Sequence, residues 1–73
     1  LIKEEAGAFL NTLIRGLKYP YKEVIYLQYY DGLNSREIAE ILGISPANVR
    51  KISSRAKEQL KKGMLKKGYT YEF

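Results

Sequence analysis

Positively charged side chains in one stretch of the sequence are the residues best suited to a chemical task. Between Pro46 and Lys62 the chain carries six Lys or Arg residues and one acid, Glu58. Residues 1–31 carry no net charge, whereas residues 32–73 hold the whole net charge of +5. A basic surface confined to one part of a small domain indicates binding to nucleic acid or to an anionic lipid surface.

Few residues are available for enzymatic chemistry. The 73-residue chain contains no His and no Cys, which removes the common general base, the thiolate nucleophile, disulfides and the usual zinc ligands. Acid–base catalysis would depend on Asp and Glu, but Glu37 and Glu40 are expected to form a helix cap and part of a solvent-exposed face. We therefore expect a protein that is not an enzyme and that uses no metal, other cofactor or small-molecule substrate.

The elements that must position the basic stretch are predicted to be helices. Apolar residues recur at helical spacing almost throughout the chain, with no alternation typical of strands. We expect an all-α domain of four small helices without a winged element, which occupies residues 1–68 and is followed by a tail of residues 69–73. The expected helices span residues 2–17, 20–30, 35–42 and 46–62, and the last could continue with a break to residue 68.

The joint between the last two predicted helices is short and well specified. Asn34 and Glu37 form a capping-box-like pair at the start of the third helix. Gly43 suits the left-handed position that ends a helix, and Ser45 with Pro46 suits the start of the next. The inner face of the third helix is expected to comprise Ile38, Ala39, Ile41 and Leu42. Such a sharp crossing resembles the helix-turn-helix motif, in which the second helix enters the DNA major groove.

The outward face of the last helix can be read from its inward face. The expected inward residues are Val49, Ile52, Ala56 and Leu60. Arg and Lys near the helix start can donate to guanine, and short side chains let the backbone approach the bases; the expected base-reading residues are Ala47, Arg50, Lys51 and Ser54. Phosphate contacts supply affinity and register; the residues expected to make them are Arg36, Ser45, Arg55, Lys57, Lys61 and Lys62. A merely solvated basic face is the alternative interpretation.

Several motifs together make residues 8–62 resemble region 4 of the sigma-70 family of bacterial RNA polymerase sigma factors. The motifs are the Leu17–Pro20 entry, Glu23-Val24-Ile25, the Tyr30-Asp31-Gly32 turn, the stretch from Glu37 to Ser45, and Arg55-Ala56 followed by Leu60. The combination is specific, whereas each piece alone is common. Ile52 and Ser53 stand where many extracytoplasmic-function members have a basic residue and Leu, so the subgroup stays open.

The resemblance implies a partner as well as a DNA site. Region 4 reads the −35 element of promoter DNA with its last helix and docks on the flap of the RNA polymerase β subunit with its first two helices. The residues that would contact the flap are Leu13, Leu17, Tyr26 and Tyr30. An anti-sigma factor is a further possible partner, and the implied location is the bacterial cytoplasm, in association with the nucleoid. Region 2 is absent and the chain begins at Leu1, which favours a piece of a longer protein.

Two other functions remain open from the sequence. Two-component response regulators end in a similar four-helix DNA-binding domain, but its recognition helix usually carries a His, which this chain lacks. A region 4-like protein-interaction module with an incidental basic face is the second alternative. A membrane-inserted helix is not expected, because no apolar run approaches bilayer length and the last helix lacks apolar bulk.

The aromatic residues have two interpretations. Those at positions 19, 21, 26, 29 and 30 could stack on single-stranded bases, or they could be half-buried core and flap-contact residues with hydrated hydroxyl groups; the second interpretation is favoured. Tyr69, Tyr71 and Phe73 in the tail could fold back onto the core, contact another domain or be disordered.

Overall fold

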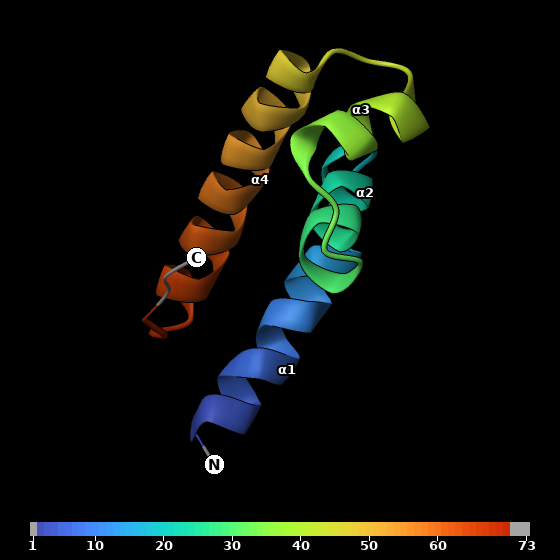
Figure 1. Cartoon of the computed structure of the whole chain (residues 1–73). Coiled ribbons are helices and arrows are strands. Elements are labelled where there is room, and N and C mark those ends of the chain that lie inside the picture. The colour runs from blue at the N-terminus through green and yellow to red at the C-terminus, as the bar shows by residue number, and fades with distance from the viewer. Residues whose placement is uncertain (1, 71–73) are drawn as a thin grey trace.

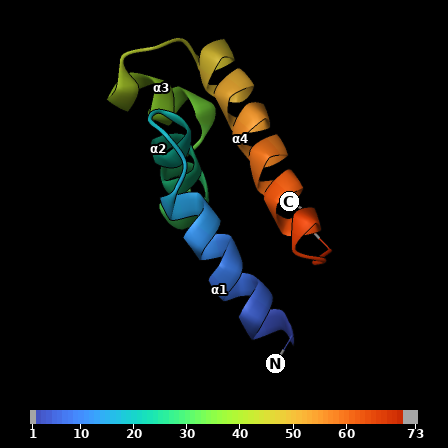
Figure 2. The same cartoon turned by 180° about the vertical axis from the view of Figure 1, so that it is seen from behind.

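The computed structural model describes residues 2–70, and within that range every regular element is helical. The elements are α1 (Ile2–Arg15), α2 (Tyr21–Ile25), the π-helical segment η1 (Tyr26–Tyr30), α3 (Ser35–Leu42) and α4 (Pro46–Lys66). Figure 1 shows α1 and α2 following each other on one side of the molecule, α3 at one end and α4 running alongside; Figure 2 shows the same arrangement from behind. The predicted all-α class is confirmed, and the described residues contain no winged element.

Two clusters of buried side chains form the core. The first joins α1 and α2 to the second half of α4, and its buried members are Ile14, Ile25, Ala56 and Leu60. The second lies where α2, α3 and the start of α4 meet, and its buried members are Val24, Ile38, Ala39 and Val49. The second cluster therefore supports the joint between α3 and α4, and the first holds the far end of α4 against α1.

The first two helices differ slightly from their predicted bounds. Helix α1 ends at Arg15 instead of residue 17 because Gly16 follows it in a turn, in which the Gly16 N–H donates to the carbonyls of Thr12 and Leu13. Helix α2 begins at Tyr21, so Pro20 precedes the helix and is not its first residue. The expected second helix continues to Tyr30, but its last five residues form a π-helix in which the Asp31 N–H donates to the Tyr26 carbonyl. Its wider turns were not predicted.

The predicted caps of α3 are confirmed. The Glu37 N–H donates to Asn34 Oδ1, and the Asn34 N–H donates to Glu37 Oε1, each at 2.9 Å. Gly43 has φ of 71° in the left-handed region. The prediction that Ile41 belongs to the inner face is wrong, because 60% of its surface is exposed. Each residue turns an α-helix by about 100°. This places Ile38, Ala39 and Leu42 on one side of α3 and Ile41 outside that side.

Helix α4 is one uninterrupted helix of 21 residues that ends at Lys66, so the predicted end near residue 62 is wrong, and the helix contains no break. The interior Gly63 is explained by packing: an ideal Cβ there would lie only 2.8 Å from Cδ1 of Leu13 on α1. Helix α4 ends in a Schellman motif, in which Gly68 has φ of 92° and the Tyr69 N–H donates to the Met64 carbonyl at 3.0 Å.

The start of the tail folds back onto α1. The Tyr69 ring lies 5.8 Å from the Phe9 ring between centroids, and Lys67 Nζ lies 5.5 Å from the centroid of the same Phe9 ring. This contact extends the first core cluster toward the end of α4. Tyr71 and Phe73 lie outside the described residues.

Candidate nucleic-acid interface

The turn from α3 to α4 has the geometry that the sequence predicts for a helix-turn-helix. The N–H groups of Gly43 and Ile44 both donate to the Ala39 carbonyl, at 2.8 and 3.1 Å. The Asn48 N–H donates to Ser45 Oγ at 3.1 Å, which caps α4. Ile44 is half-buried at the corner and packs against the second core cluster. The first turns of α4 are therefore held at a fixed position relative to α3.

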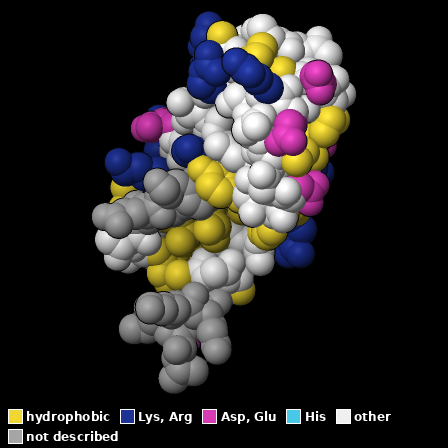
Figure 3. All heavy atoms as spheres, in the orientation of Figure 1, with side chains coloured by type: hydrophobic (Ala, Val, Ile, Leu, Met, Phe, Trp, Pro, Cys, Tyr) yellow, Lys and Arg dark blue, Asp and Glu magenta, His cyan; other side chains and the backbone are white. Residues whose placement is uncertain are grey.

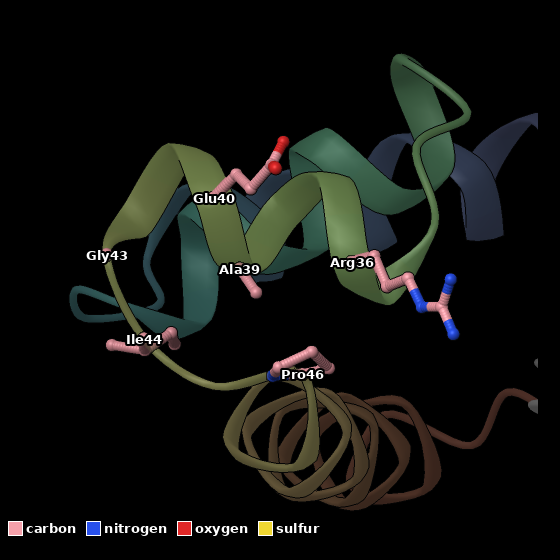
Figure 4. A pocket seen from close by; sticks show the side chains of 6 residues that line it. All are labelled: Arg36, Ala39, Glu40, Gly43, Ile44 and Pro46. Atoms are coloured by element: carbon pink, nitrogen blue, oxygen red, sulfur yellow. The ribbon is translucent and has the colours of Figure 1, made fainter.

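A surface pocket of about 360 Å³ lies at this corner, lined by Arg36, Ala39, Glu40, Gly43, Ile44 and Pro46. In Figure 4, Ala39 points from α3 toward Pro46 at the start of α4. Glu40 points to the other side of α3, and the Arg36 guanidinium extends away from the pocket. The small side chain of Ala39 lets the two helices approach each other, and the two charged groups do not converge on a ligand within the pocket.

The four residues predicted to read bases all lie on one exposed part of α4. Ala47, Arg50, Lys51 and Ser54 are exposed. The buried residues of this helix are Val49, Ser53, Ala56, Leu60 and Met64. Because the buried residues follow a helical spacing of three and four, the exposed residues between them form a continuous outward face. Two guanidinium or ammonium groups and two short side chains lie together there, the composition that suits entry into a major groove.

The residues predicted to contact phosphate surround this face. Arg36, Ser45, Arg55, Lys61 and Lys62 are exposed. Lys57 differs, because it is half-buried and its Nζ lies 5.5 Å from the centroid of the Tyr29 ring. Figure 3 shows Lys and Arg side chains over the first turns of α4 and along its side of the molecule, and Asp and Glu side chains over the α3 side. On the face drawn there, basic side chains predominate over the α4 side and acidic side chains over the α3 side.

The residues predicted to contact the polymerase flap have mixed environments. Leu13, Leu17 and Tyr26 are half-buried and pack against the first core cluster. Tyr30 is 57% exposed; its ring lies 5.1 Å from that of Tyr26, and its hydroxyl donates to Asn11 Oδ1 on α1. Of the five Tyr residues around the second predicted helix, Tyr21 and Tyr26 are half-buried, whereas Tyr19, Tyr29 and Tyr30 are exposed. The favoured half-buried interpretation therefore holds for two of the five.

The sequence analysis missed an exposed apolar residue near the end of α4. Leu65 is 53% exposed and lines a shallow surface groove of about 550 Å³ with Lys62, Gly63 and Lys66. The groove lies on the part of α4 that Leu13 of α1 contacts. Figure 3 shows hydrophobic side chains gathered between α1 and this part of α4. Extending the helical spacing of the last helix beyond Gly63 would have revealed Leu65 beside the buried Met64.

Ser53 is a second residue that the sequence analysis missed. The sequence predicts Ile52 as the inward residue of this turn, but Ser53 is 5% exposed and Ile52 is half-buried. The Ser53 hydroxyl donates to Gln28 Oε1 of η1 at 2.7 Å. The signal was present as the spacing Val49–Ser53–Ala56–Leu60, but a polar residue in that series was not recognised as inward.

The described part of the chain carries neither a metal-binding cluster nor a membrane-spanning helix. Within residues 2–70 no group of three or more acidic side chains is placed to hold a metal ion. No described helix combines the length and apolarity that crossing a membrane requires.

Comparison with known proteins agrees with this geometry. The family model of sigma-70 region 4 matches residues 10–60. The chain is 31% identical over 70 residues to a protein described as the probable RNA polymerase sigma factor RfaY of Xanthomonas campestris pv. campestris. That match covers 96% of this chain and 17% of the relative, so the chain spans about a sixth of the relative's length. The comparison with solved structures finds no match.

The chain belongs to the sigma-70 region 4 family. This membership supports a sigma-factor role in DNA binding and in transcription. Region 4 is a non-enzymatic domain of transcription factors. The match is to a sigma-factor family, so the response-regulator alternative has no support from the comparisons.

Proposed function

We propose that this chain recognises the −35 element of a promoter through the first half of α4 while it docks on the β flap of RNA polymerase. What supports DNA reading most directly is the exposed face of α4 with Arg50 and Lys51, which projects from a capped and buried helix-turn-helix. Seven of the residues in α4 are basic and one is acidic. Helix α3 carries one basic and two acidic residues, so the positive charge of the helix-turn-helix is concentrated on α4.

The division of labour within α4 follows from side-chain chemistry. Arg50 and Lys51 can donate to O6 and N7 of guanine, and Ala47 and Ser54 leave room for the helix backbone in the groove. Arg36, Ser45 and Arg55 flank these residues and are assigned to the DNA backbone. Lys57, Lys61 and Lys62 lie further along the helix and are also assigned to phosphates, where they supply affinity without sequence preference.

The proposed polymerase contact is centred on the surface groove near the end of α4. Exposed Leu65 offers an apolar anchor, and Lys62 and Lys66 flank it with positive charge. Leu13 of α1 lies next to Gly63 of the groove. Half-buried Leu17 and the neighbouring rings of Tyr26 and Tyr30 are proposed to extend the contact. A helix from the β flap with one apolar face would suit this surface. The same groove could accept an anti-sigma factor. A protein-interaction role is therefore the second candidate function.

The DNA-reading part of the proposal is tested by two charge-removing variants and two matched controls. Arg50→Ala should cost about 1–3 kcal/mol of binding free energy and relax the preference at one base pair. Lys61→Ala should weaken binding to all sequences alike and reduce the slope of log affinity against log salt by about one unit. Arg15→Ala and Lys18→Ala remove the same charges from exposed positions in the part of the chain that has no net charge, and should change affinity little.

Binding would be measured by fluorescence anisotropy with duplexes selected by the chain from a pool randomised at its centre, at several salt concentrations. Equal effects of Arg50→Ala and Arg15→Ala would refute the assignment of the reading face. Docking would be tested by titrating a labelled β flap-tip peptide with the chain, using Leu65→Ala to remove the anchor. Flap binding that persists unchanged in this variant would remove the groove from the proposal.

A further inference from the structure

Ser53 is an unusual member of the inner face of α4. It is the polar residue among the buried side chains of the described chain, and it occupies a position in the helical series at which the other members are apolar. Burial of a hydroxyl without a hydrogen bond is unfavourable, so its position depends on its partner. That partner is Oε1 of Gln28, 2.7 Å from Ser53 Oγ.

The partner belongs to η1, the one described segment with π-helical hydrogen bonding. The next residue of η1, Tyr29, lies beneath Lys57, one turn further along α4. Tyr30, at the end of the same segment, donates to Asn11 of α1. Consecutive residues of η1 therefore contact two successive turns of α4 and one turn of α1. Short π-helical segments are often found at functional positions.

The hydrogen bond between Ser53 and Gln28 restricts rotation of α4 about its own axis more strongly than apolar packing does. Apolar contact is non-directional, whereas a hydrogen bond weakens steeply with misalignment. Rotation of a helix by roughly 20° displaces a side chain roughly 5–6 Å from the axis by about 2 Å. Such a displacement exceeds the tolerance of a bidentate contact to a base. Ser54, the neighbour of Ser53, and Arg50, one turn earlier, belong to the proposed reading face.

We propose that Gln28 and Ser53 are positioning residues that fix the rotation of α4 about its own axis, and thereby set which side chains face the DNA bases. The proposal rests on the DNA-reading function proposed above and adds two residues that touch no DNA. Loss of the bond should therefore lower discrimination between sequences more than it lowers general affinity for DNA.

Apolar replacements of Ser53 and Gln28, made singly and together, separate an effect on stability from an effect on the position of α4. Ser53→Ala and Gln28→Leu each leave one polar group unpaired, and both should lower the unfolding midpoint. The double variant Ser53→Ala/Gln28→Leu removes both polar groups, so most of the lost stability should return. Its ratio of affinities for the selected duplex and for a scrambled duplex should nevertheless stay about three- to tenfold below that of the unchanged chain. Gln28→Glu keeps an acceptor oxygen of the same reach and should retain the ratio.

The measurement is anisotropy with both duplexes at one low salt concentration, together with thermal unfolding of each variant of the full chain. Gln59→Leu, an exposed substitution of the same type on α4, is the control and should leave both quantities unchanged. Recovery of the affinity ratio together with stability in the double variant would overturn the positioning role. If the unchanged chain itself does not discriminate between the duplexes, the DNA-reading proposal fails and the positioning role fails with it.

Discussion

Replacing Gly43 and Gly7 by Ala, the same chemical change at two sites, measures how strongly the helix-turn-helix depends on the left-handed backbone at Gly43. Gly43 has φ of 71° in the turn between α3 and α4, whereas Gly7 lies inside α1. Both residues are exposed, and an ideal Cβ built at either position meets no neighbouring atom within 4 Å. Replacement by Ala therefore adds a methyl group without a clash at both sites, and the difference between the variants reports backbone conformation.

The expected effects have opposite signs. Gly43→Ala should lower the free energy of unfolding by about 1–2 kcal/mol, because a residue with a Cβ is strained in the left-handed region. Gly7→Ala should raise it by about 0.5–1 kcal/mol, because Ala loses less backbone entropy than Gly when it enters a helix. For a domain of this size, each kcal/mol should move the thermal midpoint by about 4–8 °C.

The assay is urea unfolding followed by far-ultraviolet circular dichroism, with the dependence on urea compared between variants to verify that the unfolding transition is unchanged. Gly43→Ala should also weaken DNA binding more than its effect on the folded fraction explains, because the turn sets the start of the helix proposed to read DNA. A neutral or stabilising Gly43→Ala variant would refute the claim that the joint needs a left-handed residue. A destabilising Gly7→Ala variant would show that the environment of α1 differs from the one described.

Three further predictions concern the supports of the interface. Asn34→Ala removes the capping box of α3 and should cost about 0.5–2 kcal/mol of stability in urea unfolding, whereas Asn34→Asp should retain most of it. Leu60→Ala should cost about 2–5 kcal/mol because Leu60 is 1% exposed, and Leu65→Ala, at 53% exposure on the same helix, should cost far less. Lys57→Met removes a cation–π contact worth about 0.5–1 kcal/mol and should lower the thermal midpoint. In a chain that already carries Tyr29→Leu the ring is absent, so adding Lys57→Met should not lower the midpoint further.

The sequence predicts those parts of the fold that depend on local rules. The capping box at Asn34, the left-handed Gly43 and the cap at Ser45 are all confirmed, because each depends on a backbone conformation or hydrogen bond within a few residues. The exposure of Ala47, Arg50, Lys51 and Ser54 on one side of α4 also follows from helical periodicity, and their role in reading bases remains a proposal. The contacts with phosphates remain predictions as well.

The features that the sequence did not predict depend on contacts between distant elements. Gly63 suggests the end of a helix by its propensity, but Leu13 of α1 occupies the space beside it and α4 continues. Ser53 is polar, but Gln28 receives its hydrogen bond and permits burial. Ile41 is apolar, but only a narrow side of α3 faces the core, and Ile41 lies outside it and is exposed. For Gly63 and Ser53, a neighbour from another part of the chain decides the outcome.

The continuity of α4 has a consequence for the spacing of its two proposed surfaces. Arg50 and Leu65 lie on one unbroken helix, so they are separated by roughly 22 Å along the axis, at a rise of about 1.5 Å per residue. The angle between them is fixed by the same helix. Inserting one residue between them would lengthen the separation only slightly but would turn one surface by about 100° relative to the other. The number of residues in α4 therefore determines the angle between the proposed DNA-reading surface and the proposed polymerase-contact surface, and changes in its length should be less tolerated than changes in its exposed side chains.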